Sequence, residues 1–200
     1  VNPNGTSSRM VHTVGKVLRP GGKQVLESQE IYYDPSRQTV DILKAAIITP
    51  EGRELSRAHV NDRTVSAMMG VETKIYDEYH LKQIRFSDLE VGTLVDLQYV
   101  IRDSGDNIYG DYFADIFYLG DQAPVAWSQY ILDLPKTRPF QTKAFRLAAQ
   151  AERVASRDPE REVFKWEAKD LKGIPEERGM PPAIDQFPFV QATTMKSWEE

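Results

Sequence analysis

Residues that form turns interrupt this sequence at short and fairly regular intervals, and this spacing limits what the chain can fold into. The turns bracket segments of roughly 8 to 14 residues, which is typical of an all-β sandwich rather than of alternating strands and helices. Glycine, proline, aspartate and asparagine dominate such turns for conformational reasons. The clearest turn signals are Pro20-Gly21-Gly22, Asp34-Pro35-Ser36, Pro50-Glu51-Gly52, Glu90-Val91-Gly92, Ser104-Gly105-Asp106-Asn107 and Arg157-Asp158-Pro159.

The residues between the turns favour strands. Val and Ile together number 28 against 13 Leu, and branched side chains suit the half-buried surface of a sheet. Residues 93–102 show the clearest alternation of apolar and polar side chains, which predicts a strand with one face on a core and one in water. One face carries Val95, Leu97, Tyr99 and Ile101, and the other carries Asp96, Gln98 and Arg102. Further strands are predicted over 10–18, 39–49, 76–86, 112–119 and 125–134.

Residues 143–155 allow two interpretations. They are rich in alanine, arginine, glutamate and glutamine, which favour a helix when the segment is considered alone. The turn at 157–159 and the strand-like Val163-Phe164-Lys165-Trp166 after it indicate a hairpin instead. Because tertiary context often overrides propensity, we expect strands here.

The sequence changes in character after Asp170. Four of the twelve prolines fall in the last thirty residues, without a clear period. We therefore expect a β-sandwich domain over residues 1–170, and an extended, proline-rich arm over 171–200 that leads to a further C-terminal domain. Within the arm, residues 189–194 predict an edge strand. Ser197, followed by Trp198 and two glutamates, is typical of a helix start.

The composition argues against several classes of protein. Lys and Arg number 25 against 30 Asp and Glu, and this net charge of −5 does not favour binding to nucleic acid or to anionic membranes. The chain has no cysteine, so it contains no thiol nucleophile, disulfide or thiolate metal site. No apolar run approaches the roughly 18 residues of a membrane span, so we expect no membrane insertion. The chain begins at Val1 without a Met, and we expect a processed or excised chain whose export signal has been removed.

The remaining reactive residues form no catalytic motif. The three histidines, His12, His59 and His80, lack the spacing of metal ligands. Neither a Gly-x-Ser-x-Gly nor a Ser-x-x-Lys motif is present, and no cofactor-binding motif is found. We therefore expect a chain that is not itself an enzyme and that binds no cofactor. A self-sufficient hydrolase would instead bring two of the histidines together in one pocket.

Two groups of residues are candidates for binding. Asp103, Asp106, Asn107 and Asp111 form the densest group of oxygen ligands, and Ca²⁺ takes about 6 to 8 oxygens. Their spacing does not match the Asp-x-Asp-x-Asp-Gly loop, and the same residue types are common in turns, so a plain turn is the first interpretation and a calcium site the alternative. Tyr109, Tyr112 and Tyr130 are candidates for an exposed aromatic surface that binds a glycan or a peptide, whereas Trp127 and Trp166 are expected in the core.

An ordered series of turn and strand signatures resembles a known family. The series consists of Val17-Leu18, Ile31-Tyr32-Tyr33-Asp34-Pro35, Ile47-Ile48-Thr49-Pro50-Glu51-Gly52, Phe86-Ser87-Asp88-Leu89-Glu90-Val91-Gly92, Pro124-Val125, Leu134-Pro135, Phe164-Lys165-Trp166 and the arm that ends at Ser197-Trp198. It resembles the domain of unknown function 3857, an N-terminal module of bacterial proteins that carry a transglutaminase-like domain after it.

This resemblance implies a fold, a compartment and a partner. It implies an antiparallel β-sandwich similar to the N-terminal β domain of zinc aminopeptidases, and export to the periplasm or the cell surface. The Cys, His and Asp of the transglutaminase-like domain would lie after Glu200, so no catalytic residue is carried over to this chain. The resemblance therefore favours a non-catalytic accessory module that positions or recruits substrate for a transglutaminase-like cysteine peptidase or amidase domain of the same polypeptide. The alternative is an independent module that binds a glycan or a peptide.

Overall fold

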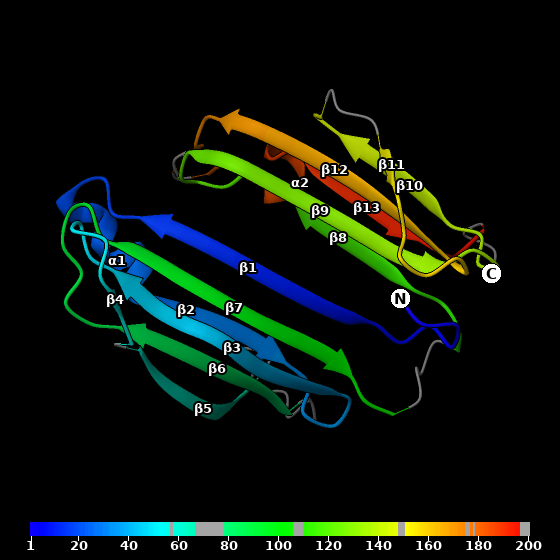
Figure 1. Ribbon diagram of the computed structural model, residues 1–200, viewed down its shortest axis with the longest axis horizontal. Helices are drawn as coiled ribbons and strands as arrows, with labels where there is room; N and C mark the ends of the chain where they lie inside the picture. The colour runs from blue at the N-terminus through cyan, green and yellow to red at the C-terminus, as the bar shows by residue number, and fades with distance from the viewer. Residues whose placement is uncertain are drawn as a thin grey trace. The chain divides into compact units, whose positions relative to one another are not determined.

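The computed structural model describes residues 1–56, 58–66, 78–105, 110–147, 151–174, 177 and 179–196 (Figure 1). The chain divides into two compact units. We call Ser8–Gly105 the first sandwich, and Val1–Ser7 together with Asp106–Glu200 the second sandwich. Each contains two antiparallel sheets and its own buried core. The predicted all-β, antiparallel sandwich architecture is confirmed.

The first sandwich pairs a four-stranded sheet with a three-stranded sheet. The larger sheet has the order β1-β7-β3-β4, with strands Ser8–Lys16, Leu94–Asp103, Gln38–Ile48 and Glu54–Leu55. The smaller sheet has the order β2-β6-β5, with strands Ser28–Tyr33, Glu78–Phe86 and Ala58–Ser66. The strand predicted over 93–102 is therefore β7, and it pairs with both β1 and β3.

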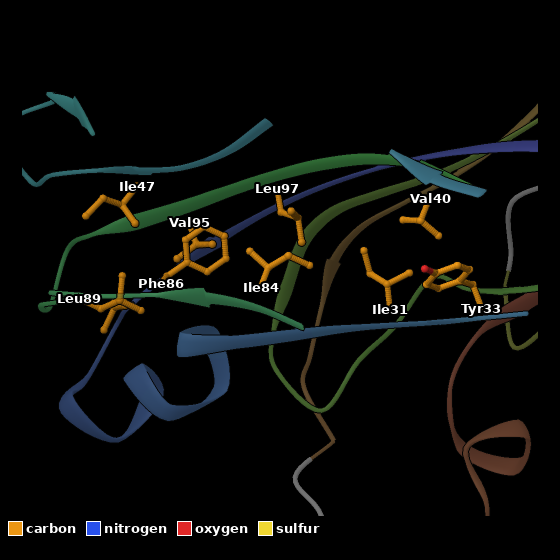
Figure 2. Close-up of a cluster of buried hydrophobic side chains, with 10 residues drawn as sticks. Ile31, Tyr33, Val40, Ile47, Ile84, Phe86, Leu89, Val95 and Leu97 are labelled. Carbon is orange, nitrogen blue, oxygen red and sulfur yellow. The ribbon is translucent and has the colours of Figure 1, made fainter. Parts of the chain in front are cut away.

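The core of the first sandwich is mostly aliphatic. Figure 2 shows the side chains of Ile31, Ile84 and Phe86 from the smaller sheet facing those of Val95 and Leu97 from β7. Val95 and Leu97 belong to the apolar face predicted from the alternating pattern. The remaining buried members of this core are Val17, Tyr33, Val40, Ile47 and Leu89.

Two of the turn signatures pack together at one end of the larger sheet. Gly92 has a φ of +97°, a conformation that residues with a Cβ rarely adopt. A Cβ at this position would lie 3.2 Å from Cγ of Pro50, and the Gly92 amide donates to the carbonyl of Val17. The Pro-Glu-Gly and Val-Gly signatures therefore meet where β7 begins.

The Pro20-Gly21-Gly22 signal does not form a hairpin turn. Pro20–Gly22 is a 3₁₀ turn, and it continues into the short helix α1, Lys23–Glu27, before β2 begins. Proline is favoured at the first position of a helical turn, because its fixed φ suits that position and its missing N–H is not needed there. Neither α1 nor β2 is among the elements predicted from the sequence.

The second sandwich consists of two three-stranded sheets. One has the order β10-β13-β8, with strands Gln141–Phe145, Phe189–Thr193 and Ala114–Tyr118. The other has the order β11-β12-β9, with strands Glu152–Val154, Arg161–Leu171 and Val125–Pro135 (Figure 1). The expectation of strands around 143–155 is supported at both ends of that segment by β10 and β11, and residues 148–150 lie outside the described part.

The core of the second sandwich is rich in aromatic residues. Trp166 is buried, and its ring lies 5.6 Å from that of Tyr130, which stacks on Phe117 at 5.1 Å. Its buried residues are Leu119, Tyr130, Leu132, Leu134, Trp166, Ala168, Val190 and Ala192.

The structure divides the chain near residue 105, and not at residue 170 as expected from the sequence. β13 is the middle strand of its sheet, where it pairs with β10 on one side and β8 on the other, rather than the predicted edge strand. Val190 and Ala192 of this strand are buried in the core. The segment after residue 171 is thus part of the second sandwich, because its short apolar strand completes a sheet. The short helix α2, Ala183–Gln186, precedes β13. None of the described helices is long and apolar enough to span a membrane.

Candidate functional site

A buried arginine in the second sandwich marks the candidate site. Arg138 follows the end of β9 in the segment Leu134-Pro135-Lys136-Thr137-Arg138-Pro139. The amide of Arg138 donates to the carbonyl of Pro135 at 3.0 Å, and that of Lys136 donates to the carbonyl of Glu160 at 2.9 Å. This tight turn holds the Arg138 side chain within the unit, where only 10% of it is exposed.

The guanidinium of Arg138 has two protein partners and one unused donor. Nη1 donates to the backbone carbonyl of Pro3, and Nη2 lies 3.1 Å from Oδ2 of Asp111. Nε is buried, and in the described part of the chain no acceptor lies within hydrogen-bonding distance of it. It is the one buried side-chain nitrogen or oxygen in that part without a partner. A buried donor without an acceptor is destabilising and is uncommon in folded proteins.

Arg138 lines a cavity of about 360 Å³ in the second sandwich. This volume is at the lower end of the range of small-molecule sites, about 300 to 1,000 Å³. The walls combine proline rings, hydroxyl groups and charged groups. The lining residues are Pro3, Asp111, Tyr112, Pro135, Thr137, Arg138, Pro139, Thr194 and Lys196.

The charges around the cavity favour an anionic group. Arg138 and Lys196 contribute two positive charges and Asp111 contributes one negative charge, although the whole chain carries −5. Asp111 is exposed over 70% of its side chain, so its attraction to Arg138 is screened by water. The hydroxyl of Thr194 accepts a hydrogen bond from the amide of Phe113 at 2.8 Å, which fixes this wall.

The candidate tyrosines have different positions in the structure. Tyr112 lines the Arg138 cavity, as a ligand-binding role requires. Tyr130 is only 9% exposed, packs in the core and donates to Asp115 at 3.0 Å, so it does not belong to an exposed aromatic surface. Its side chain lies on the inner face of β9 with Leu132 and Leu134. Tyr109 lies outside the described residues.

The two tryptophans also differ. Trp166 is in the core as predicted, whereas 56% of Trp127 is exposed. Trp127 pairs with Lys169 across β9 and β12, and its side chain points to the opposite face from the buried Tyr130. The expectation that Trp127 is buried is therefore wrong, because an odd-numbered position in β9 faces away from the core.

The candidate oxygen ligands do not form a metal cluster in the described residues. Asp103, at the end of β7 in the first sandwich, accepts a hydrogen bond from Nε2 of Gln38 at 3.2 Å. Asp111, in the second sandwich, pairs with Arg138. Asp106 and Asn107 lie outside the described part. Within the described part, no three His, Asp or Glu side chains lie close enough to hold a metal ion together.

Asp62 in the first sandwich is surrounded by hydrogen-bond donors. Its Oδ2 accepts from the Tyr33 hydroxyl and from Nζ of Lys82, each at 2.8 Å, and its Oδ1 lies 3.3 Å from Nδ1 of His80. Burial opposes ionisation of Asp62, but hydrogen bonds from Lys82 and Tyr33 outweigh it and lower the pKa of this carboxyl. Burial, together with the contact to Asp62, raises the pKa of Tyr33 to about 12.

Asp96 forms a second such centre on β7. Its two carboxylate oxygens lie 2.9 Å from Nε2 of His12 and 2.9 Å from Nζ of Lys44, and Lys44 also contacts Glu54 at 2.8 Å. Burial opposes ionisation of Asp96, but hydrogen bonds from Lys44 and His12 outweigh it and lower the pKa. His12 and His80 thus belong to two separate carboxylate clusters, each of which also contains a lysine.

Sequence reasoning missed Arg138, Lys196, Asp62 and Asp96 as parts of polar clusters. The alternating pattern places Asp96 correctly on the polar face of its strand, but it carries no information about the partners of this residue. For Arg138, the closely spaced prolines at 135 and 139 signal a constrained turn. Nothing in the sequence pairs it with Pro3, 135 residues away.

Comparisons with known proteins extend over nearly the whole chain. The sequence model of a family described as a domain of unknown function with solved structure, DUF3857, matches residues 3–175 and so covers parts of both sandwiches. No curated protein matches the sequence. A crystal structure of a protein from Parabacteroides distasonis, described as "a putative protease", has the same fold, with a TM-score of 0.83 and 15% sequence identity. The match covers 98% of this chain but 38% of that protein, so this chain spans less than half of its relative's length.

Proposed function

Because the chain belongs to the DUF3857 family, we propose that it is a non-catalytic module that positions or recruits substrate for a peptidase domain of the same polypeptide. The observation that carries the proposal is the coverage of the structural relative. Nearly all of this chain matches 38% of a protein described as "a putative protease", which leaves most of that protein for a different domain. The sequence of this chain has no cysteine nucleophile of its own.

The partner domain of this proposal is a transglutaminase-like cysteine peptidase or amidase that comes after this chain. The proposed location is the periplasm or the cell surface. Both parts derive from the family resemblance. The Arg138 cavity supports a recruiting role, because it offers a concave surface with both polar and apolar walls on a module without catalytic motifs.

Deletion of this chain from the full polypeptide tests the proposal. We expect a polypeptide without residues 1–200 to keep its kcat on a short peptide that fills only the catalytic cleft. Its KM for a long peptide should rise, because binding energy from remote parts of the substrate is lost. Equal kinetic constants with and without this chain on both substrates would contradict the proposal.

A competition experiment avoids the risk that the shortened polypeptide misfolds. An excess of the isolated chain, added to the intact polypeptide, should inhibit hydrolysis of the long peptide by sequestering it and leave the short peptide unaffected. Inhibition of neither reaction would count against substrate recruitment. Turnover by the isolated chain alone would overturn the non-catalytic assignment.

A second candidate is an independent peptide-binding module, which the cavity around Arg138 also favours. The two candidates differ in the consequence of peptide binding. A recruiting module changes the kinetics of its attached peptidase domain, whereas an independent module binds the same peptide without any effect on hydrolysis.

A further inference from the structure

We propose that the Arg138 cavity is a carboxylate-binding site for a peptide, and that the ligand carboxylate takes the place of the Asp111 side chain. The chemical class of the ligand is inferred from the cavity itself. Its identification as a substrate of the attached peptidase rests on the proposed function.

The first argument is the unused donor of Arg138. A guanidinium presents five N–H groups in one plane, and a carboxylate binds most strongly when it accepts two parallel N–H groups from one edge. Asp111 uses one oxygen, at 3.1 Å from Nη2, and leaves Nε without an acceptor among the described residues. The Nε and Nη2 groups share an edge, so a better-placed carboxylate on that edge satisfies both.

The second argument is the weak hold on Asp111. Seven-tenths of its side chain is exposed, and the carboxylate is attached to Arg138 by a single long contact. Water competes for this exposed carboxylate, which weakens its attraction to the buried guanidinium. Asp111 therefore occupies the site as a replaceable internal carboxylate, while the guanidinium is fixed from the other side by its bond to the Pro3 carbonyl.

The third argument is the charge left after Asp111 moves away. Arg138 and Lys196 are the other charged residues of the lining, and both are positive. Two positive charges attract an anionic ligand, and the planar fork of Arg138 selects a planar carboxylate.

The remaining walls indicate a peptide rather than a bare anion. Pro3, Pro135, Pro139 and Tyr112 offer ring surfaces next to the charged groups, and Thr137 and Thr194 offer hydroxyls. Ring surfaces beside a few well-placed polar groups are typical of sites that bind small organic ligands. The volume of about 360 Å³ suits one or a few residues of an extended peptide.

Calorimetric titration of the chain with three small probes tests the proposal. The probes are acetyl-Ala-Ala with a free C-terminal carboxylate, its C-terminal amide, and acetyl-Ala-Glu with an amidated C-terminus. Binding of the first but not the second identifies the C-terminal carboxylate as the ligand group. Binding of the third identifies an acidic side chain, and both results support a carboxylate site. Failure of both acids to bind, or equal binding of the neutral amide, overturns it.

Three substitutions change the expected affinity for the acidic probe that binds: two weaken it and one strengthens it. Arg138→Gln should weaken binding about tenfold or more, since a charge-assisted hydrogen bond is lost. Lys196→Gln should weaken binding by a smaller factor, because it removes a positive charge but none of the parallel N–H donors of the guanidinium. Asp111→Asn should strengthen binding about two- to fivefold, because the competing carboxylate is removed.

A matched control lies in the same sandwich. Asp133 pairs with Arg161 at 2.6 Å and is also well exposed, but it does not line the cavity. Asp133→Asn should leave the affinity unchanged. If Arg138→Gln fails to fold, the Asp111 and Lys196 variants still decide the outcome. Weaker or unchanged binding in Asp111→Asn, together with unchanged binding in Lys196→Gln, would overturn the proposal.

The two proposals fail in different ways. If the acidic peptide binds and the attached peptidase domain gains nothing from this chain, substrate recruitment is wrong and the carboxylate site stands. If deletion of the chain raises KM for long peptides but the acidic probes do not bind, recruitment stands and the carboxylate site is wrong.

Discussion

The two sandwiches differ in how fully their charged groups are paired with hydrogen-bond partners. In the first sandwich, Asp62 and Asp96 each have at least two donors on their oxygens, from lysine, histidine or tyrosine. In the second sandwich, the guanidinium of Arg138 keeps one buried N–H without an acceptor among the described residues, and a cavity lies beside it. A saturated cluster stabilises the fold and has nothing left to offer a ligand. An unsaturated one retains capacity to bind a ligand.

The two cores differ as well. The first is built mainly from valine, isoleucine and leucine, whereas the second adds four partly buried phenylalanines around its buried Tyr130 and Trp166. Each aromatic ring buries more surface than an aliphatic side chain, so single aromatic positions contribute more to the second core. The difference between the sandwiches therefore extends from their charges to their packing, and both aspects can be tested by substitution.

The largest expected effect comes from the cores. Trp166→Ala should destabilise the second sandwich by about 3–5 kcal/mol, and Ile84→Ala should destabilise the first by about 2–5 kcal/mol. Trp127 and Trp166 belong to the second sandwich, so tryptophan fluorescence during urea unfolding reports on that unit, while the methyl resonances of Ile31 and Ile47 report on the first. Each variant should shift the transition of its own sandwich. A single transition that both variants shift equally would show that the cores are not independent.

A smaller effect is expected when Asp96 loses its charge. Its side chain is 11% exposed and has two charged or chargeable partners, so Asp96→Asn should cost about 1–3 kcal/mol of stability. Asp133→Asn in the second sandwich should cost less than about 1 kcal/mol, because half of that side chain is exposed. Urea unfolding at neutral pH measures both. A larger loss for Asp133 would reverse the comparison between the two units.

The same carboxylates predict how the first sandwich responds to acid. The pKa values of Asp62 and Asp96 are lowered in the folded state, so the stability that they provide is fully present above the unfolded pKa of about 3.9. It is lost as the pH falls from there through the folded pKa values. The stability difference between the native chain and a variant with Asp62→Asn and Asp96→Asn should therefore be constant above about pH 4 and shrink as the pH falls below that value. A difference that stays constant below that value as well would contradict the assignment.

The smallest expected effect on stability comes from Tyr33 and is confined to high pH. The pKa of Tyr33 is raised to about 12 by burial and by its bond to Asp62, so its phenolate should form well after those of exposed tyrosines. Stability that depends on the neutral phenol is present below about pH 10 and is lost as the pH rises through the folded pKa. Ultraviolet titration of the native chain against Tyr33→Phe isolates this group. Asp62→Asn should lower the pKa, and an unchanged value would show that burial alone is responsible.

The sequence predicted those features that depend on local alternation. β7 and β3 appear within a residue or two of their predicted bounds, because each has one apolar face and clear turns around it. The short helix α1 was missed, since five residues carry too little periodic signal and lie beside a glycine pair that is typical of a turn. The division near residue 105 was also missed. Composition does not change at the point where the strands of one core end and those of the other begin.

The candidate site was predictable only in part. Tyr112 was a candidate and lines the cavity. Tyr130 was expected on an exposed surface and is buried instead, although its alternation with Leu132 and Leu134 in β9 indicates the core-facing side. Arg138 was not predictable, because its environment is made by a carbonyl at residue 3 and by side chains at 111 and 196. Contacts between residues so far apart depend on the finished topology and not on any local pattern.

The discontinuous make-up of the second sandwich has a consequence for the order of folding during synthesis. Residues 1–7 leave the ribosome before the first sandwich does. The carbonyls of Pro3 and Val1, however, accept hydrogen bonds from Arg138 and Arg161, which are made much later. Between them, the ribosome makes every residue of the first sandwich, which can fold as a unit as it emerges. Once Gly105 has emerged from the ribosome, the nascent chain therefore carries one folded sandwich, while residues 1–7 still lack their partners from the second. The cavity closes only after β13 and the residues just beyond it have been made, so a ligand-binding assay on ribosome-bound chains would report completion of the whole module.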